Sequence, residues 1–122
     1  MRKILFVEDE KILQKTLGER LKEKGYDVIS ALNGEEGVFL AKECIPDLIL
    51  LDIMLPLKNG LEVLAELKEI EETKEIPVII LTNVESAEEI EKSLQLGATT
   101  YLVKTNYHLD EVIDKIELSF KE

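Results

Sequence analysis

Residues 46–60 read Pro-Asp-Leu-Ile-Leu-Leu-Asp-Ile-Met-Leu-Pro-Leu-Lys-Asn-Gly, with the apolar run Leu48–Leu51 near their centre. The run is too continuous for a half-exposed strand and too short to span a membrane, so it predicts a strand buried on both faces, as in a parallel sheet. Asp52 ends the run, and Asn59-Gly60 is a turn signal. Aspartates near turns are common, so Asp52 alone does not indicate chemistry. The position of Asp52 at the end of a strand does indicate a functional site, because open α/β sheets bind ligands at that edge.

Apolar runs of this kind recur along the chain, separated by stretches with helical spacing. The expected strands are Ile4–Val7, Asp27–Ala31, Leu48–Leu51, Val78–Leu81 and Tyr101–Val103. Strands that alternate with helices predict right-handed βαβ units and a parallel sheet covered on both faces. The expected fold class is therefore α/β: a doubly wound, five-stranded parallel sheet in the flavodoxin-like order 2-1-3-4-5, (βα)5. Residues 1–122 are expected to form a single domain.

The helices are expected from the spacing of their apolar residues and from their end signals. The residues expected to face inward are Leu13, Leu17 and Leu21 in the first helix, Val38, Ala41 and Ile45 in the second, Ile90 and Leu94 in the fourth, and Leu109, Val112, Ile113, Ile116 and Phe120 in the fifth. Asn33 predicts an N-cap for the second helix. Ser86 with Glu89 predicts a capping box for the fourth.

The composition limits the possible partners. The chain has 26 acidic and 15 basic residues and a formal net charge of -11, which argues against a nucleic acid or an anionic membrane surface and suits basic partners or divalent cations. Cys44 is the single cysteine, so a disulfide framework and a cysteine-rich zinc site are excluded. The N-terminal apolar stretch is too short for a signal peptide, and a cytoplasmic protein is expected.

Polar residues stand where the expected strands end. Glu8-Asp9 follows the first strand, Asp52 the third, Thr82 the fourth and Lys104 the fifth. In a parallel sheet these ends share one edge, where three carboxylates would repel one another unless a hard cation such as Mg2+ neutralised them. A hydroxyl and an ammonium opposite the cation suit phosphoryl transfer, with Asp52 as the nucleophile. Each residue alone has an ordinary structural explanation, but their joint placement favours a site.

This constellation resembles the receiver domain of two-component response regulators, and the resemblance runs from Ile4 to Phe120. The motifs that carry it are Glu8-Asp9, Asp52 followed by Pro56 and Gly60, Thr82, Gly97-Ala98, and Tyr101-Leu102-Val103-Lys104. The resemblance implies that Mg2+ is the cofactor. It also implies that Asp9 and Asp52 are direct metal ligands, with the backbone carbonyl of Met54 as the third protein ligand, and that Glu8 acts through water.

The resemblance further implies that Asp52 is the phosphoacceptor, and that Thr82 and Lys104 bind the phosphoryl group. Tyr101 would be the switch aromatic, which turns inward when the threonine is drawn toward the phosphate. The phosphoryl group would come from a sensor histidine kinase or a histidine phosphotransfer protein. The helix 4, strand 5 and helix 5 face would then change to control a downstream protein that the sequence does not identify.

Within residues 1–122 the sequence predicts no output domain, no direct contact with nucleic acid and no membrane association. The protein is expected not to be an enzyme apart from self-catalysed phosphoryl transfer to, and hydrolysis from, Asp52. Two positions depart from the family pattern: Thr105 follows Lys104 in place of a proline, and Asn83 replaces a very small residue.

Other functions compete with this one. Asn83 and Thr105 leave open a pseudo-receiver, a protein-binding module without phosphorylation. A flavin or nucleotide enzyme would need a phosphate-cradling loop after the first strand, where Glu8-Asp9-Glu10 would repel the phosphate. A haloacid-dehalogenase-like phosphatase would need an aspartate where Met54 stands. His108 is assigned no role.

Overall fold

The predicted sheet and its strand order are confirmed in the computed structural model, which describes residues 1–121. The strands are β1 (Lys3–Val7), β2 (Asp27–Ala31), β3 (Leu48–Leu51), β4 (Val78–Thr82) and β5 (Thr100–Val103). The helices are α1 (Lys11–Glu23), α2 (Gly34–Cys44), α3 (Gly60–Glu69), α4 (Ala87–Gln95) and α5 (Leu109–Ser119), with a short 3-10 helix, η1, at Lys104–Asn106. The strands form one parallel sheet in the order β2-β1-β3-β4-β5.

The strand register aligns the carboxyl ends of the central strands. Val7 lies opposite Leu51, and Leu51 lies opposite Ile80. Thr82 lies opposite Val103 on the edge strand β5. The residues that follow these positions therefore meet along one edge of the sheet, as the parallel arrangement requires.

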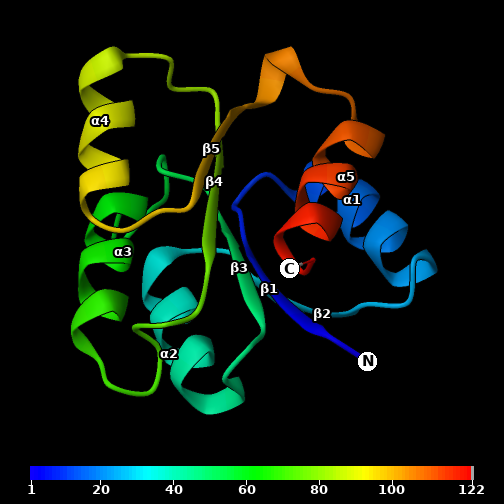
Figure 1. Ribbon diagram of the computed structural model, residues 1–122, viewed down its shortest axis with the longest axis horizontal. Coiled ribbons are helices and arrows are strands. Elements are labelled where there is room, and N and C mark those ends of the chain that lie inside the picture. Colours follow the sequence, from blue (N-terminus) through cyan, green and yellow to red (C-terminus); the bar gives the residue numbers. More distant parts are fainter. Residues whose placement is uncertain (122) are drawn as a thin grey trace.

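The core has two parts because helices cover both faces of the sheet (Figure 1). On one face α1 and α5 pack against alternate strand residues, and on the other face α2 and α3 pack against the remaining ones. The first cluster includes Ile4, Phe6, Leu48, Leu50, Leu17, Leu21, Val112, Ile113 and Ile116. The second includes Leu5, Val7, Ile49, Leu51, Val38, Ala41, Val63, Leu64 and Leu67. Alternation along strands buried on both sides explains why they read as continuous apolar runs.

Two of the inward-facing predictions were wrong. Ile45 is 42% exposed because α2 ends at Cys44 and Ile45 leaves the helix in the left-handed conformation, at φ 44°. Leu94 is 47% exposed, and the fully buried residue of α4 is its polar neighbour Ser93. The hydroxyl of Ser93 donates to the carbonyl of Ile90 at 2.9 Å, so its burial leaves no unpaired donor.

The helix caps follow the sequence closely. The Asn33 side chain accepts a hydrogen bond from the first turn of α2, as predicted. The hydroxyl of Ser86 accepts from the Glu89 amide at 3.1 Å, which confirms the N-cap, but within residues 1–121 the reciprocal bond of a capping box is not formed there. A complete capping box joins Asn59 and Glu62 at the start of α3, where the sequence predicted only a turn. Among residues 1–121, no helix has both the length and the apolar character needed to cross a bilayer.

Gly60 fixes the loop that follows Asp52. Its amide donates to the carbonyl of Ile53 at 2.8 Å, so the chain folds back on itself between Ile53 and Gly60, shortly after the strand ends at Leu51. A Cβ atom at Gly60 would lie 2.1 Å from the carbonyl oxygen of Asp52 and 2.6 Å from the Cα of Ile53. A glycine is therefore required for the backbone of α3 to approach the strand end so closely.

We expect Gly60→Ala to lower the free energy of unfolding by about 3 kcal/mol, because the added methyl group collides with backbone that cannot move independently. Gly18→Ala is the matched control: no heavy atom outside its own helix lies within 4 Å of the added Cβ, and α1 is regular there. This control should raise the free energy of unfolding by about 0.5–1 kcal/mol. Urea unfolding measures both, and an equal effect of the two substitutions would contradict the backbone-contact argument.

Candidate functional site

The strand ends bring the predicted site residues, apart from Tyr101, into one pocket of about 240 Å³. Its lining residues are Glu8, Asp9, Glu10, Asp52, Met54, Thr82, Asn83 and Lys104. The backbone positions them, since the amide of Asp52 donates to the carbonyl of Val7 at 3.1 Å and extends the pairing of β1 with β3 by one residue. Glu8 and Asp52 are therefore neighbours by register rather than by a loop conformation.

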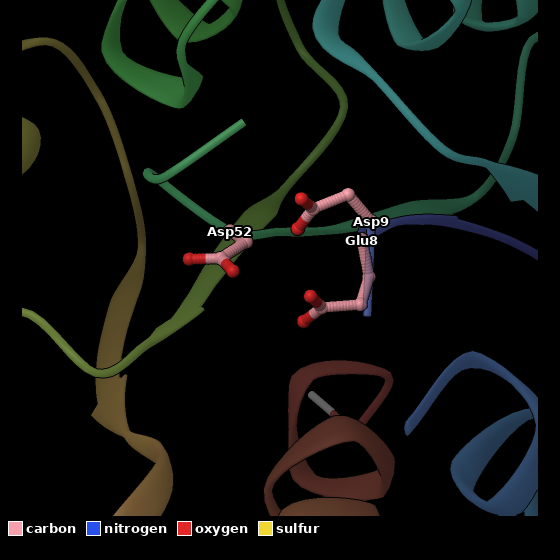
Figure 2. A group of neighbouring side chains, drawn as sticks. All are labelled: Glu8, Asp9 and Asp52. Atoms are coloured by element: carbon pink, nitrogen blue, oxygen red, sulfur yellow. The ribbon is translucent and has the colours of Figure 1, made fainter. Parts of the chain in front are cut away.

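Three carboxylates meet at this edge. Figure 2 shows Glu8 and Asp9 at the end of β1, with both carboxylates on the side that faces Asp52. One oxygen from each lies within 4.8 Å of those of the other two. Glu8 is fully buried and Asp52 is 4% exposed, while Asp9 is open to solvent. An oxygen-only donor set of this charge, open on one side, fits a hard divalent cation.

Lys104 is the cation that the fold supplies. Its Nζ lies 3.0 Å from Oδ2 of Asp52 and 2.8 Å from Oε1 of Glu8. Burial lowers the pKa of Lys104, but the attraction of Glu8 and Asp52 outweighs it and holds the pKa above its ordinary value. The contact with Glu8 is an ion pair without hydrogen-bond geometry, and within residues 1–121 Oε1 of Glu8 has no hydrogen-bond partner. One ammonium therefore serves two buried carboxylates, which leaves negative charge uncompensated.

The pKa of Glu8 is raised in this pocket, as expected from burial and from the uncompensated negative charge. Burial, with the repulsion of Asp52 added to it, raises the pKa of Glu8 from 4.5 to about 7, although Lys104 and the amide of Glu10 act in the opposite direction. The amide of Glu10 donates to the other carboxylate oxygen, Oε2, at 3.1 Å. Glu8 therefore takes up a proton near neutral pH when no cation lies in the pocket. The raised pKa of Glu8 fits a pocket that carries more negative charge than Lys104 compensates.

Thr82 and Tyr101 meet on the backbone of Val84. Thr82 is fully buried in the pocket wall, and its Oγ1 accepts from the Val84 amide at 3.4 Å. The half-buried Tyr101 donates its hydroxyl to the Val84 carbonyl at 2.7 Å. One residue thus joins the pocket to β5 and to the segment that leads into α4. Sequence reasoning named Thr82 and Tyr101 but did not predict that both would bond to the backbone of Val84, because main-chain bonds leave no residue-type signal.

The remaining predicted positions are also placed. Met54 lines the pocket, and its amide donates to Oδ1 of Asp52 at 3.3 Å, while the ligand role of its carbonyl stays a prediction. Asn83 is exposed at the mouth of the pocket. Thr105 lies within η1, and every peptide bond among residues 1–121 is trans. His108 is exposed at the start of α5, where its amide donates to Glu111, and it takes no part in the pocket.

A family model described as the response regulator receiver domain matches residues 4–117. The chain belongs to this family. It is similar to a CheY-like response regulator receiver domain protein from Methanospirillum hungatei, with 27% identity over 98% of this chain and 93% of that chain and a TM-score of 0.91. It is also similar to the Mn2+-bound form of the response regulator Rcp1, with 34% identity over 98% and 94% of the two chains and a TM-score of 0.85.

A third similar structure is the BeF3-activated N-terminal receiver domain of RstA from Klebsiella pneumoniae. It has 29% identity over 98% of this chain and 99% of that chain, with a TM-score of 0.89. The match over almost the full length of each domain confirms the flavodoxin-like receiver fold that the sequence predicted. The five-stranded order 2-1-3-4-5 thus agrees between the sequence, the structure and the family.

Without divalent cations, we expect the free energy of unfolding to fall as the pH rises through neutrality. The pKa of Glu8 is raised from 4.5 to about 7 by folding, so the folded state binds this proton more tightly. The resulting stabilisation is fully present below pH 4.5 and is lost as the pH passes about 7. The loss should reach about 3 kcal/mol between about pH 5 and about pH 8 in urea unfolding.

Glu8→Gln should flatten this pH dependence, because the amide does not titrate. Glu19→Gln, on the exposed face of α1, is the matched control and should keep the parent profile. If Glu8→Gln keeps the parent slope, then another group carries the titration and the charge assignment of the pocket is wrong.

Proposed function

We propose that this receiver domain is a phosphorylation-dependent signalling switch, with Asp52 as the phosphoacceptor and Mg2+ as the cofactor. The observation that carries the proposal is a buried Asp52 held between the ammonium of Lys104 and the carboxylates of Glu8 and Asp9. Similar receiver domains support it, one in a Mn2+-bound form and one described as BeF3-activated. The donor would be a sensor histidine kinase or a histidine phosphotransfer protein in the cytoplasm, and a downstream protein would receive the signal.

The proposed chemistry follows from what each side chain can reach. A carboxylate oxygen of Asp52 attacks the phosphorus, the bond from phosphorus to the donor nitrogen breaks, and the histidine keeps the electron pair. Lys104, already 3.0 Å from Asp52, transfers its pairing to a phosphoryl oxygen, and the hydroxyl of Thr82 binds another. Bound Mg2+, held by Asp9, Asp52 and the Met54 carbonyl and through water by Glu8, would neutralise the carboxylates and the phosphoryl charge.

The proposed switch uses the backbone of Val84. When the hydroxyl of Thr82 turns to the phosphoryl group, the weak bond from the Val84 amide is released. The Val84 carbonyl stays bonded to Tyr101, so a shift of this residue moves both the start of α4 and the ring on β5. Differential contacts of this kind let a phosphoryl group favour one of two conformations of the α4-β5-α5 face.

Incubation with acetyl phosphate and Mg2+ should add one phosphoryl group to the chain, because the proposed site needs only a donor and the metal. Asp52→Asn and removal of Mg2+ by a chelator should each abolish the addition, while Asp114→Asn on the exposed face of α5 should leave it unchanged. Intact-mass analysis under conditions that preserve acyl phosphates measures it. Equal labelling of Asp52→Asn contradicts the assignment, and an unlabelled parent that still binds the metal favours the pseudo-receiver alternative.

Beryllofluoride with Mg2+ should shift amide resonances at residues 86–94 and 101–109 as well as in the pocket. Tyr101→Phe removes the bond to Val84 and should shrink the shifts at 86–94 while those around Asp52 remain. Tyr26→Phe, whose ring packs on Phe120 near the other edge of the sheet, is the matched control. Two-dimensional NMR measures the shifts, and changes confined to the pocket in the parent would rule out the proposed route.

A further inference from the structure

Helix α4 leaves its apolar side chains partly or largely exposed. Ala87, Ile90 and Leu94 follow one another at spacings of three and four, so they lie on one face of the helix. Ala87 is exposed, Ile90 is half-buried and Leu94 is 47% exposed, whereas Ser93 occupies the buried position toward the core. We call Ala87, Ile90 and Leu94 the α4 stripe. Figure 1 shows α4 at the margin of the molecule.

The α4 stripe forms the wall of a shallow groove of about 480 Å³. Glu91 and Gln95 complete the lining. Single exposed apolar residues are normal on a protein surface, but aligned apolar residues that line a groove mark an interaction site. Because Ser93 is the buried residue of α4, the fold leaves the apolar residues of this helix only partly covered, which points to a second partner for them.

The acidic side chains beside the α4 stripe favour a partner with positive charge. Glu88 and Glu91 are exposed on α4, Glu85 precedes it, and Lys92 is the one basic residue of the helix. A second copy of the chain packed symmetrically on this face would set the same glutamates against each other. The net charge of -11 adds to that repulsion and also disfavours nucleic acid and anionic membranes. A positively charged protein segment is the occupant that remains favourable.

We propose that the α4 stripe docks a basic amphipathic segment of a partner protein, with apolar side chains at helical spacing and Lys or Arg beside them. The apolar residues fill the groove, and the basic residues pair with Glu88 and Glu91. The inference rests on the proposed function, in that it names the chemistry of the partner that the α4-β5-α5 face controls. Val84 is hydrogen-bonded to Thr82 and Tyr101 and lies two residues before the N-cap of α4. A movement of Thr82 in the pocket can therefore be passed through Val84 to the helix that carries the stripe.

The test uses the whole chain and two synthetic probes of about 18 residues, or five helical turns. One labelled peptide carries leucines along one helical face and lysines elsewhere, and the other has glutamates in place of the lysines. Fluorescence anisotropy should show that the lysine peptide binds at least about tenfold more tightly than the glutamate peptide. The Glu88→Gln/Glu91→Gln variant should bind it more weakly and with a smaller salt dependence.

A matched pair of leucine variants separates docking from general attraction to an acidic protein. Leu94→Ser should raise the dissociation constant of the lysine peptide about tenfold. Leu118→Ser removes a leucine of similar exposure, 58%, from α5 outside the groove and should leave the constant unchanged. Equal effects of the two variants, or no effect of Leu94→Ser, would overturn the proposal.

Two further outcomes are decisive. If light scattering shows a dimer that Leu94→Ser converts to a monomer, a second copy covers the stripe and the proposal is wrong. If the lysine peptide binds at the stripe with equal affinity with and without beryllofluoride, docking stands and the proposed switch fails. Labelling of Asp52 is measured separately, so failure of the phosphorylation chemistry and failure of the docking surface remain distinguishable.

Discussion

The repulsion among Glu8, Asp9 and Asp52 is the constraint on which the site depends. The parallel register places two of these carboxylates in the interior, and Lys104 compensates only part of their charge. The fold therefore maintains an excess of negative charge in a largely buried pocket, where a bound cation would change the balance strongly. Charge that would destabilise an ordinary core here suits the binding of a divalent cation.

The sequence predicted the site because each member stands at a strand end. The parallel sheet that follows from the apolar runs places these scattered positions on one edge, so Asp52, Thr82 and Lys104 could be grouped from the sequence. Their interactions could not be predicted in the same way. The sharing of Lys104 between two carboxylates depends on side-chain geometry, and the bonds that Thr82 and Tyr101 make to Val84 depend on main-chain atoms.

The fourth helix shows a second limit of sequence reasoning. Helical spacing identifies an apolar face but does not say which structure covers it, so Leu94 was predicted to face the core. Ser93 is buried instead, and its hydroxyl donates a hydrogen bond to the carbonyl of Ile90 within the same helix. Burial of a small, self-satisfied polar residue costs little, and the fold can therefore leave Leu94 at the surface. The prediction for Leu94 failed at a surface that is proposed to bind a partner protein.

The packing of α5 has a consequence for how the chain matures during synthesis. Val112, Ile113 and Ile116 cover Ile4, Phe6 and other residues of the earliest strands, and Phe120 lies 4.4 Å beneath the guanidinium of Arg2. Because α5 lies far along the chain from β1, the ribosome synthesises these packing partners at well-separated times. Until α5 emerges, part of one side of the sheet stays open to water, and the nascent chain presents an apolar surface suited to chaperone binding and prone to aggregation.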